Sequence, residues 1–182
     1  MHSERCTSGS ARGHAKLPVA RSARRACSTQ PYIPMRRGFL YLCVIMDWAT
    51  RRVLSWRLSN TLTTDFCTAA LKEALARHGT PEIFNTDQFT SAEFTGVLID
   101  NQIQISMDGR GRCHDNIFVE RLWWTVKHEW VYLRPCDNGI EQQRSLAQCF
   151  EWYNRRRPHQ SLGWQTPDEV YFAAAKPLAL AA

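Results

Sequence analysis

The ten residues GFLYLCVIMD, at positions 38–47, constrain the fold of this chain more than any other segment. They form a continuous apolar run rich in β-branched and aromatic residues, which is typical of a buried strand. A turn at WATR (48–51) follows, and then the alternating segment RVLSWRLS (52–59). This order predicts a β-hairpin.

Helical and strand patterns alternate along the rest of the chain. Residues 61–82 predict a helix, because apolar residues recur at helical spacing until Gly79 and Pro81 end the pattern. Short strands are expected at IFNTD and QISMD, and helices are expected at SAEFTGVLIDNQ, at NIFVERLWWTVKHEWVYL and over roughly residues 140–154. Strands joined by helices after an opening hairpin predict a mixed α/β sheet.

Residues 1–30 differ from the remainder in composition. They are rich in Arg, Ser and Ala and nearly free of large apolar residues, so they offer too little apolar surface to offset the entropy of ordering the chain. We therefore expect a disordered basic N-terminus over 1–30, a globular domain over 31–171 and a C-terminal tail over 172–182. The N-terminus is either a plain basic tail or an arm that contacts nucleic acid.

Charge and cysteine content give weaker indications. A net charge of +6 favours an anionic partner such as nucleic acid. The seven cysteines occur singly, without a CxxC pair, which fits neither a zinc site nor a disulfide framework and predicts a reducing cytoplasm. No apolar run approaches the roughly 18 residues of a membrane span, and the N-terminus has no apolar signal core. We expect a cytoplasmic protein without a membrane partner.

Two acidic residues occupy positions at which a sheet of this kind binds ligands. Asp87 follows the strand expected at IFNT, and the carboxyl ends of such strands meet at one edge of the sheet. Glu120 lies in the first turns of a helix that Asp115 or Asn116 can cap. If this helix packs across the sheet edge, it brings Glu120 close to Asp87. On spacing alone, a solvated or capping role explains each acid better.

Four segments occur in an order that is specific to one family: MDWATRRVLSW, SMDGRGRCHDNIFVERLW, KHEWVYL and YNRRRPHQSLGWQTPDEVY. From about Tyr32 to Tyr171 the chain resembles bacterial insertion-sequence transposases, whose catalytic domain is similar to retroviral integrase. The resemblance implies a ribonuclease-H-like fold and an Asp, Asp, Glu triad that binds two Mg²⁺ or Mn²⁺ ions. In that family the metals activate water, and then a 3′ hydroxyl, for in-line attack on DNA phosphodiesters. Double-stranded DNA and transposase multimers are the implied partners, with no small-molecule substrate.

By this resemblance the second family Asp is Asp87 and the Glu is Glu120, both as catalytic and as metal-binding residues. The first family Asp falls on Thr29, three residues before Tyr32. A neutral hydroxyl adds no charge to a site for hard divalent ions, so the resemblance predicts a metal-dependent polynucleotidyl transferase that is inactive in this copy. Asp47 is the other acid to consider, and its place at the hairpin turn favours a structural role.

Two further departures from the family accompany Thr29. The first central strand reads ARRACSTQP, in which adjacent arginines and Pro31 are unsuited to a sheet ladder, so we expect this strand to be degraded. After Asp87 the family has Gln, Gly, Ser, Gln, Phe, whereas here Gln88 and Phe89 follow directly, a loss of three residues. We interpret the chain as a truncated, decayed copy translated in a wrong frame before about residue 31. An upstream nucleotide sequence without a family-like strand in another frame would contradict this interpretation.

Basic residues near aromatic ones supply the second chemical signal. The family resemblance makes DNA contacts of residues in the Gly-rich loop, on the Glu120 helix and at the last helix end: Arg110, Arg112, Lys127, Arg155, Arg156, Arg157 and His159. For Lys127 the alternative is an ordinary solvated lysine, and for residues 155–159 it is a helix end favoured by the helix dipole. We interpret the tryptophans, among them Trp124 and Trp164, as core residues rather than platforms for bases.

Three functions remain open at this point. An active transferase requires an acid in place of Thr29. A catalytically inactive, DNA-binding fragment that interferes with transposition agrees with the basic segments, and a nonfunctional pseudogene product that folds poorly agrees with the spoiled strand. We favour an integrase-type core protein of DNA transposition and integration that is inactive and binds DNA nonspecifically, with strong dependence on salt.

Overall fold

The computed structural model describes residues 25–29, 31–86, 91–107 and 117–175. The strands are β1 (Arg25–Thr29), β2 (Tyr32–Pro34), β3 (Phe39–Asp47), β4 (Val53–Ser59), β5 (Ile83–Thr86) and β6 (Gln104–Met107). The α-helices are α1 (Asp65–His78), α2 (Ala92–Asp100), α3 (Ile117–Trp124), α4 (Gly139–Arg155) and α5 (Pro167–Ala175). A π-helical segment, η1 (Thr125–Val131), continues α3, and a 3₁₀ turn, η2 (Gln160–Leu162), follows α4.

The strands form one mixed sheet. Its order is β2-β3-β1-β5-β6, and β4 pairs with β3. β1 runs antiparallel to β3 but parallel to β5, which in turn runs parallel to β6. The predicted mixed α/β sheet is confirmed, and the predicted hairpin is the antiparallel pair of β3 and β4.

β1 and β2 pair with β3 in one unbroken register. The backbones of Thr29 and Tyr32 both pair with β3, and between them the Pro31 carbonyl accepts a hydrogen bond from the Leu42 amide at 3.0 Å. Pro31 therefore removes one donor from the ladder without shifting the pairing.

The prediction that residues 1–30 lack regular structure was wrong for Arg25–Thr29. These residues form the central strand, bonded to β3 on one side and to β5 on the other. Two neighbouring strands satisfy the backbone groups, and the small side chain of Ala26, 4% exposed, fits among the residues of β3, β5 and α1. Residues 1–24 and residue 30 lie outside the described residues, and the expectation for them stays a prediction.

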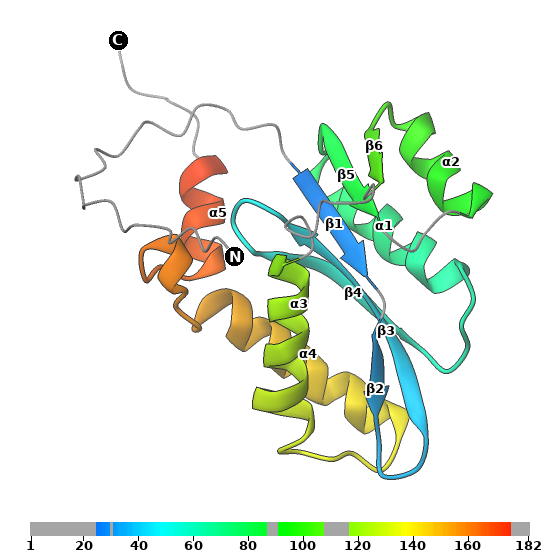
Figure 1. Cartoon of the computed structure of the whole chain (residues 1–182), viewed down its shortest axis with the longest axis vertical. Helices are drawn as coiled ribbons and strands as arrows, with labels where there is room; N and C mark the ends of the chain where they lie inside the picture. The colour runs from blue at the N-terminus through cyan, green and yellow to red at the C-terminus, as the bar shows by residue number, and fades with distance from the viewer. Residues whose placement is uncertain (1–24, 30, 87–90, 108–116, 176–182) are drawn as a thin grey trace, which may run out of the picture.

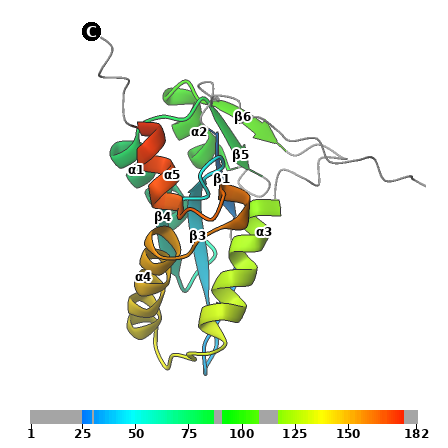
Figure 2. The ribbon, with the colours of Figure 1, turned by 90° about the vertical axis from the view of Figure 1, so that its left-hand side faces the viewer.

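Helices cover both faces of the sheet (Figures 1 and 2). The helices α3 and α4, with η1, pack on one face, and α1 and α2 pack on the other. β3 contributes to both cores, because successive side chains of a strand point to opposite faces. Leu42, Val44 and Met46 belong to the first core, whereas Cys43 and Ile45 belong to the second. All five are at most 2% exposed, as expected for a strand buried on both faces.

The predicted helices are present, and one of them changes its helix type along its length. Ser91 caps α2 by accepting a hydrogen bond from the Phe94 amide, and Asn138 caps α4 by accepting one from the Glu141 amide. The long helix predicted after residue 116 changes from α3 to the π-helical η1 at Thr125–Val131. None of the helices within the described ranges is long and apolar enough to cross a membrane.

The helix α5 was not predicted, and it extends past the expected domain boundary at residue 171. Its start carries a reciprocal cap: the Thr166 hydroxyl accepts from the Glu169 amide at 3.3 Å, and the Glu169 carboxylate accepts from the Thr166 amide at 2.7 Å. Pro167 occupies the first helical position, where its missing N–H has no cost. The sequence TPDE therefore contains a helix-start signal.

Candidate functional site

The carboxyl ends of β1, β5 and β6 lie at one edge of the sheet, because these three strands are parallel. Ser28, near the end of β1, pairs with Thr86, the last residue of β5. Thr29 and Asp87 are the next residues along the chain, and Asp87 lies outside the described residues. The predicted site thus falls where two neighbouring parallel strands end, at the edge where α/β sheets bind ligands.

Glu120 lies in the first turn of α3, with its side chain exposed. The buried side chains of Val119 and Leu122 belong to the first core and hold α3 against the sheet, where the helix also packs on β1. Within the described part of the chain, no hydrogen bond or ion pair engages the Glu120 carboxylate. This carboxylate is therefore available to a cation.

The described residues alone do not supply the ligands of a centre with two divalent ions. The described residues contain no cluster of three His, Cys, Asp or Glu side chains that could hold a metal ion. Two ions that bridge attacking and leaving oxygens require several converging carboxylates. The sequence supplies Asp87 and Glu120 for such a centre, but at the end of the central strand it supplies Thr29.

Asp47 has a structural role. Its carboxylate accepts hydrogen bonds from the amide of Thr50, at 3.0 Å, and from the hydroxyl of the same residue, which closes the β3–β4 turn. Asp47 pairs with Ala26 near the amino end of β1, whereas Thr29 ends that strand. The two positions are three residues apart along β1, about 10 Å. Asp47 therefore cannot substitute for an acid at position 29.

The predicted DNA contacts are distributed over separate parts of the fold. Lys127 lies on η1, half-buried, with its ammonium nitrogen 4.7 Å from the centre of the Tyr32 ring. Arg110 and Arg112 lie outside the described residues. Lys127 is thus positioned near the junction of β1 and β2, and the two loop arginines stay predictions.

Two of the three arginines at the end of α4 are held in ion pairs. Arg155 pairs with Glu151 at 3.0 Å. Arg157 pairs with Glu129 through two nitrogens, at 2.6 Å from Nη2 to Oε1 and 3.2 Å from Nε to Oε2. Arg156 is exposed at the end of the helix. Of the three, Arg156 is the one most available to an external phosphate.

His159 is a neutral packing residue. Its ring lies edge-on to the Tyr153 ring, with centroids 4.9 Å apart, and its Nε2 atom is buried without a hydrogen-bond partner among the described residues. Burial, together with the positive charges of Arg157 and Arg51, lowers the pKa of His159 to about 4. At neutral pH this imidazole contributes no positive charge to a DNA contact.

The interpretation of the tryptophans as core residues holds for some and fails for others. Trp123, Trp130 and Trp152 pack against the first core. Trp124 and Trp164 are 47% and 70% exposed, so for them the interpretation was wrong. Of the adjacent pair Trp123 and Trp124, only Trp123 packs against the core. The sequence alone does not show which of the two side chains is buried.

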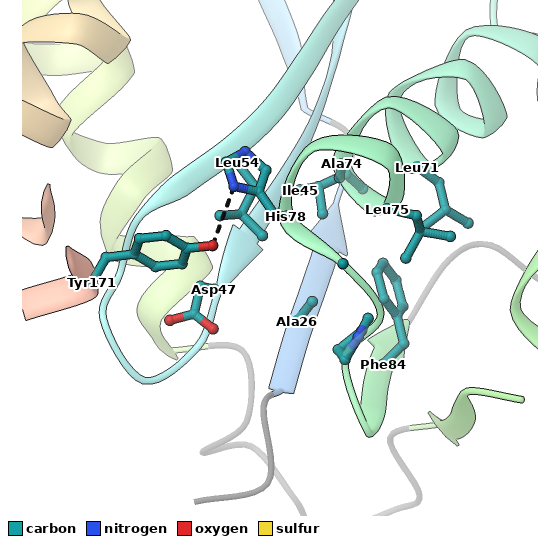
Figure 3. Close-up of a pocket in the computed structure, with 12 residues that line it drawn as sticks. Ala26, Ile45, Asp47, Leu54, Leu71, Ala74, Leu75, His78, Phe84 and Tyr171 are labelled. Atoms are coloured by element: carbon teal, nitrogen blue, oxygen red, sulfur yellow. Dashed lines mark hydrogen bonds between the residues drawn. The ribbon is translucent and has the colours of Figure 1, made fainter. Parts of the chain in front are cut away.

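A small cavity, of about 30 Å³, lies between α1, the end of β3 and α5 (Figure 3). Its polar side chains include Asp47, His78 and Tyr171. The Tyr171 hydroxyl lies 3.2 Å from Nδ1 of His78, and a guanidinium nitrogen of Arg52 lies 3.4 Å from the same atom. Burial lowers the pKa of His78, and Arg52 lowers it further. No local motif could indicate this group, because its members come from segments far apart in sequence.

Comparison with protein families identifies the domain. Two models, both described as integrase core domain, match residues 28–113 and residues 101–167. Transposase InsF for insertion sequence IS3A of Escherichia coli strain K12 is 31% identical in an alignment of length 147, which covers 76% of this chain and 50% of the relative. The transposase for insertion sequence element IS629 of Shigella sonnei is 28% identical over 150 residues, covering 79% and 51%.

Solved structures agree on the fold. The HTLV-2 integrase catalytic core domain, in complex with magnesium, matches with a TM-score of 0.64 and 17% identity, covering 82% of this chain and 96% of that chain. The catalytic core domain of BIV integrase gives a TM-score of 0.67 and 14% identity, covering 85% and 97%. The predicted ribonuclease-H-like sheet is therefore confirmed.

The chain spans about half the length of the curated relatives that it matches. The matched segment includes the central strand from residue 28, the strand that leads to Asp87, and the helix of Glu120. Sequence relatives and fold agree, and the chain belongs to the integrase-core transposases of insertion sequences.

Proposed function

We propose that this chain is a transposase core that binds double-stranded DNA and lacks the transferase activity of its family. The observation that carries the proposal is the residue at the end of the central strand. Thr29 ends β1 directly after the pairing of Ser28 with Thr86, beside the strand that leads to Asp87. A carboxylate is expected at this position from the family resemblance, and a hydroxyl stands there instead.

The loss of this charge matters because the chemistry depends on charge neutralisation. Two divalent ions near one phosphodiester repel each other, and converging carboxylates offset that repulsion. Asp87 and Glu120 alone supply two negative charges. We infer that the site binds at most one divalent ion weakly, with the remaining coordination positions filled by water.

Related structures suggest which metal ion and which assembly to test. HTLV-2 integrase core was solved in complex with magnesium in both a dimeric and a trimeric form. By analogy, Mg²⁺ or Mn²⁺ is the ion to titrate, and a multimer is the form in which an active relative of this chain would process DNA.

DNA binding in our proposal uses cations on separate elements of the fold. Lys127 lies beside Tyr32, close to the end of β1, and Arg156 is exposed at the end of α4. Arg110 and Arg112, in the Gly-rich loop before α3, complete the set by family resemblance. Because these contacts are with phosphate, affinity should fall steeply with salt and depend little on sequence.

A nonfunctional, poorly folded product is the alternative, and the fold argues against it. The strand register from β1 through β2 is unbroken, and two cores of buried side chains enclose the sheet. The fold therefore supports an inactive but folded core, which would compete for DNA with an intact transposase. A cooperative thermal unfolding transition would support it, and a gradual one would support the poorly folded product.

Calorimetric titration with Mn²⁺ tests the proposal most directly. We expect weak binding by the wild type, further loss in Glu120→Ala, and tighter binding in Thr29→Asp, which restores the missing charge. Ser28→Asp is the matched control, because it adds the same charge one position earlier in β1. Tight binding of two ions by the wild type, together with nicking of a labelled duplex, would overturn the proposed inactivity.

A further inference from the structure

A row of aromatic rings follows Glu120 along the exposed side of the helix. Trp124 stacks on His128, with centroids 5.1 Å apart and planes inclined by 26°, and His128 meets Tyr132 edge-on at 5.1 Å. Trp124 is 47% exposed and Tyr132 is 52% exposed. The spacing of four residues from Glu120 to Trp124 and onward places these side chains on one side of α3 and η1.

A second row lies on β2 and β3. Tyr32 contacts Phe39 edge-on at 6.1 Å, and Phe39 contacts Tyr41 edge-on at 5.3 Å. Tyr32 and Phe39 are more than half exposed. Ile33 belongs to the first core, so its neighbour Tyr32 points to the other face of the sheet. The two rows therefore meet at the β2 edge, where Lys127 extends from η1 to lie over the Tyr32 ring. We call Tyr32, Phe39, Trp124, His128 and Tyr132 the aromatic face.

The charges on the aromatic face favour a polyanion. The Arg121 guanidinium lies 4.8 Å from the centre of the Trp124 ring, and Lys127 lies over Tyr32. Arg37, in the turn between β2 and β3, is exposed. Among the described residues, Glu120 is the acid that borders the row on α3. An apolar protein partner would have to remove water from these cations without compensation, which is unfavourable.

We propose that the aromatic face binds an unpaired DNA strand by base stacking. The inference rests on the proposed function as a DNA-binding core and specifies the form of DNA that it holds beside the sheet edge. Every base has a π face, so exposed aromatic side chains stack on single strands with little sequence preference while cations hold the backbone. In a duplex the bases stack on one another and their faces are inaccessible. The aromatic face therefore selects DNA whose strands are separated.

Fluorescence anisotropy with a labelled oligothymidylate and a labelled duplex tests this proposal. We expect Trp124→Leu and Tyr32→Leu each to weaken oligothymidylate binding by about tenfold, with duplex affinity nearly unchanged. Trp164→Leu is the matched control, because Trp164 is an exposed tryptophan outside the aromatic face, in the turn before α5. It should leave both affinities unchanged.

Salt dependence separates stacking from charge. Phosphate contacts weaken steeply as salt rises, whereas base stacking depends on it little. Trp124→Leu should remove affinity at every salt concentration and keep the salt slope. Lys127→Gln should reduce the slope. A slope change in Trp124→Leu that matches the change in Lys127→Gln would overturn the stacking role.

The remaining outcomes are distinguishable. Duplex binding without oligothymidylate binding would overturn this inference and leave the proposed function intact, whereas binding of neither probe would overturn both. Self-association that Trp124→Leu abolishes, without binding to the single strand, would show a protein-docking face instead. Thermal unfolding of each variant confirms that it is folded, and Phe39→Leu replaces any variant that is not.

Discussion

Arg52 and Asp168 form a partly buried ion pair that fastens α5 to the β3–β4 hairpin. Their atoms Nε and Oδ1 are 2.6 Å apart, and the two side chains are 15% and 16% exposed. The Arg52 guanidinium also lies over the rings of Tyr171 and Phe172, at 4.5 and 5.0 Å. One arginine thus contacts three residues of α5. This explains how a helix too short to be stable alone is held in place.

Replacing Asp168 should release this helix end. We expect Asp168→Asn to lower the free energy of unfolding by about 2 kcal/mol, because the negative charge is lost while the positive charge of Arg52 stays partly buried. Urea denaturation measures the change. Glu151→Gln is the control, because it removes an exposed pair with Arg155 and should cost less than about 0.5 kcal/mol. Equal losses in the two variants would show that burial of the Asp168 pair has no effect.

Pro31 leaves one backbone acceptor of β3 without its ladder donor. Its carbonyl accepts from the Leu42 amide, and in an antiparallel pair of this kind the Leu42 carbonyl would accept a second bond in return. Pro31→Val restores that donor. Pro34→Val is the control, since Pro34 occupies the opposite phase of the ladder and both variants gain similar chain freedom when unfolded. We expect Pro31→Val to be more stable than Pro34→Val by about 1 kcal/mol. Equal melting temperatures would contradict this.

The sequence could predict β3 and most helices, because their apolar patterns are long and periodic. β1 could not be predicted in this way. Arg25–Thr29 has almost no large apolar residues, and its order comes from two flanking strands that local composition does not reveal. The family resemblance indicated where this strand lies in the sequence, but it did not predict that the strand forms. It also indicated Asp87 and Glu120, whereas exposure of Trp124 depends on how α3 rotates against the sheet.

Basic sequence alone could not distinguish DNA contacts from structural ion pairs. Arg155, Arg156 and Arg157 are equivalent letters in the sequence, but two of them face carboxylates contributed by other turns or elements. Glu129 is 28 residues before Arg157, so the pair is visible only in three dimensions.

Lowered histidine pKa values predict a loss of stability in acid. The pKa of His159 is lowered to about 4 from an ordinary value of 6.5, and burial also lowers that of His78. Between these pH values the unfolded chain binds protons that the folded chain does not, so stability falls as the pH decreases from 6.5 toward 4. We expect His159→Gln to reduce the change in the urea midpoint between pH 7 and pH 5. A dependence as steep as that of the wild type would contradict the neutral, buried imidazole.

Arg156 and Arg157 should separate binding from stability. Arg157→Ala removes a two-point ion pair with Glu129 whose side chains are 17% and 28% exposed, so it should lower the free energy of unfolding by about 2 kcal/mol. Its effect on the salt dependence of duplex binding should be small, because the guanidinium is already engaged. Arg156→Ala should leave stability nearly unchanged and reduce the salt slope by about 1, as expected for one lost phosphate contact. If Arg157→Ala reduces the slope instead, DNA displaces Glu129 from Arg157, and the ion pair exists only in the DNA-free protein.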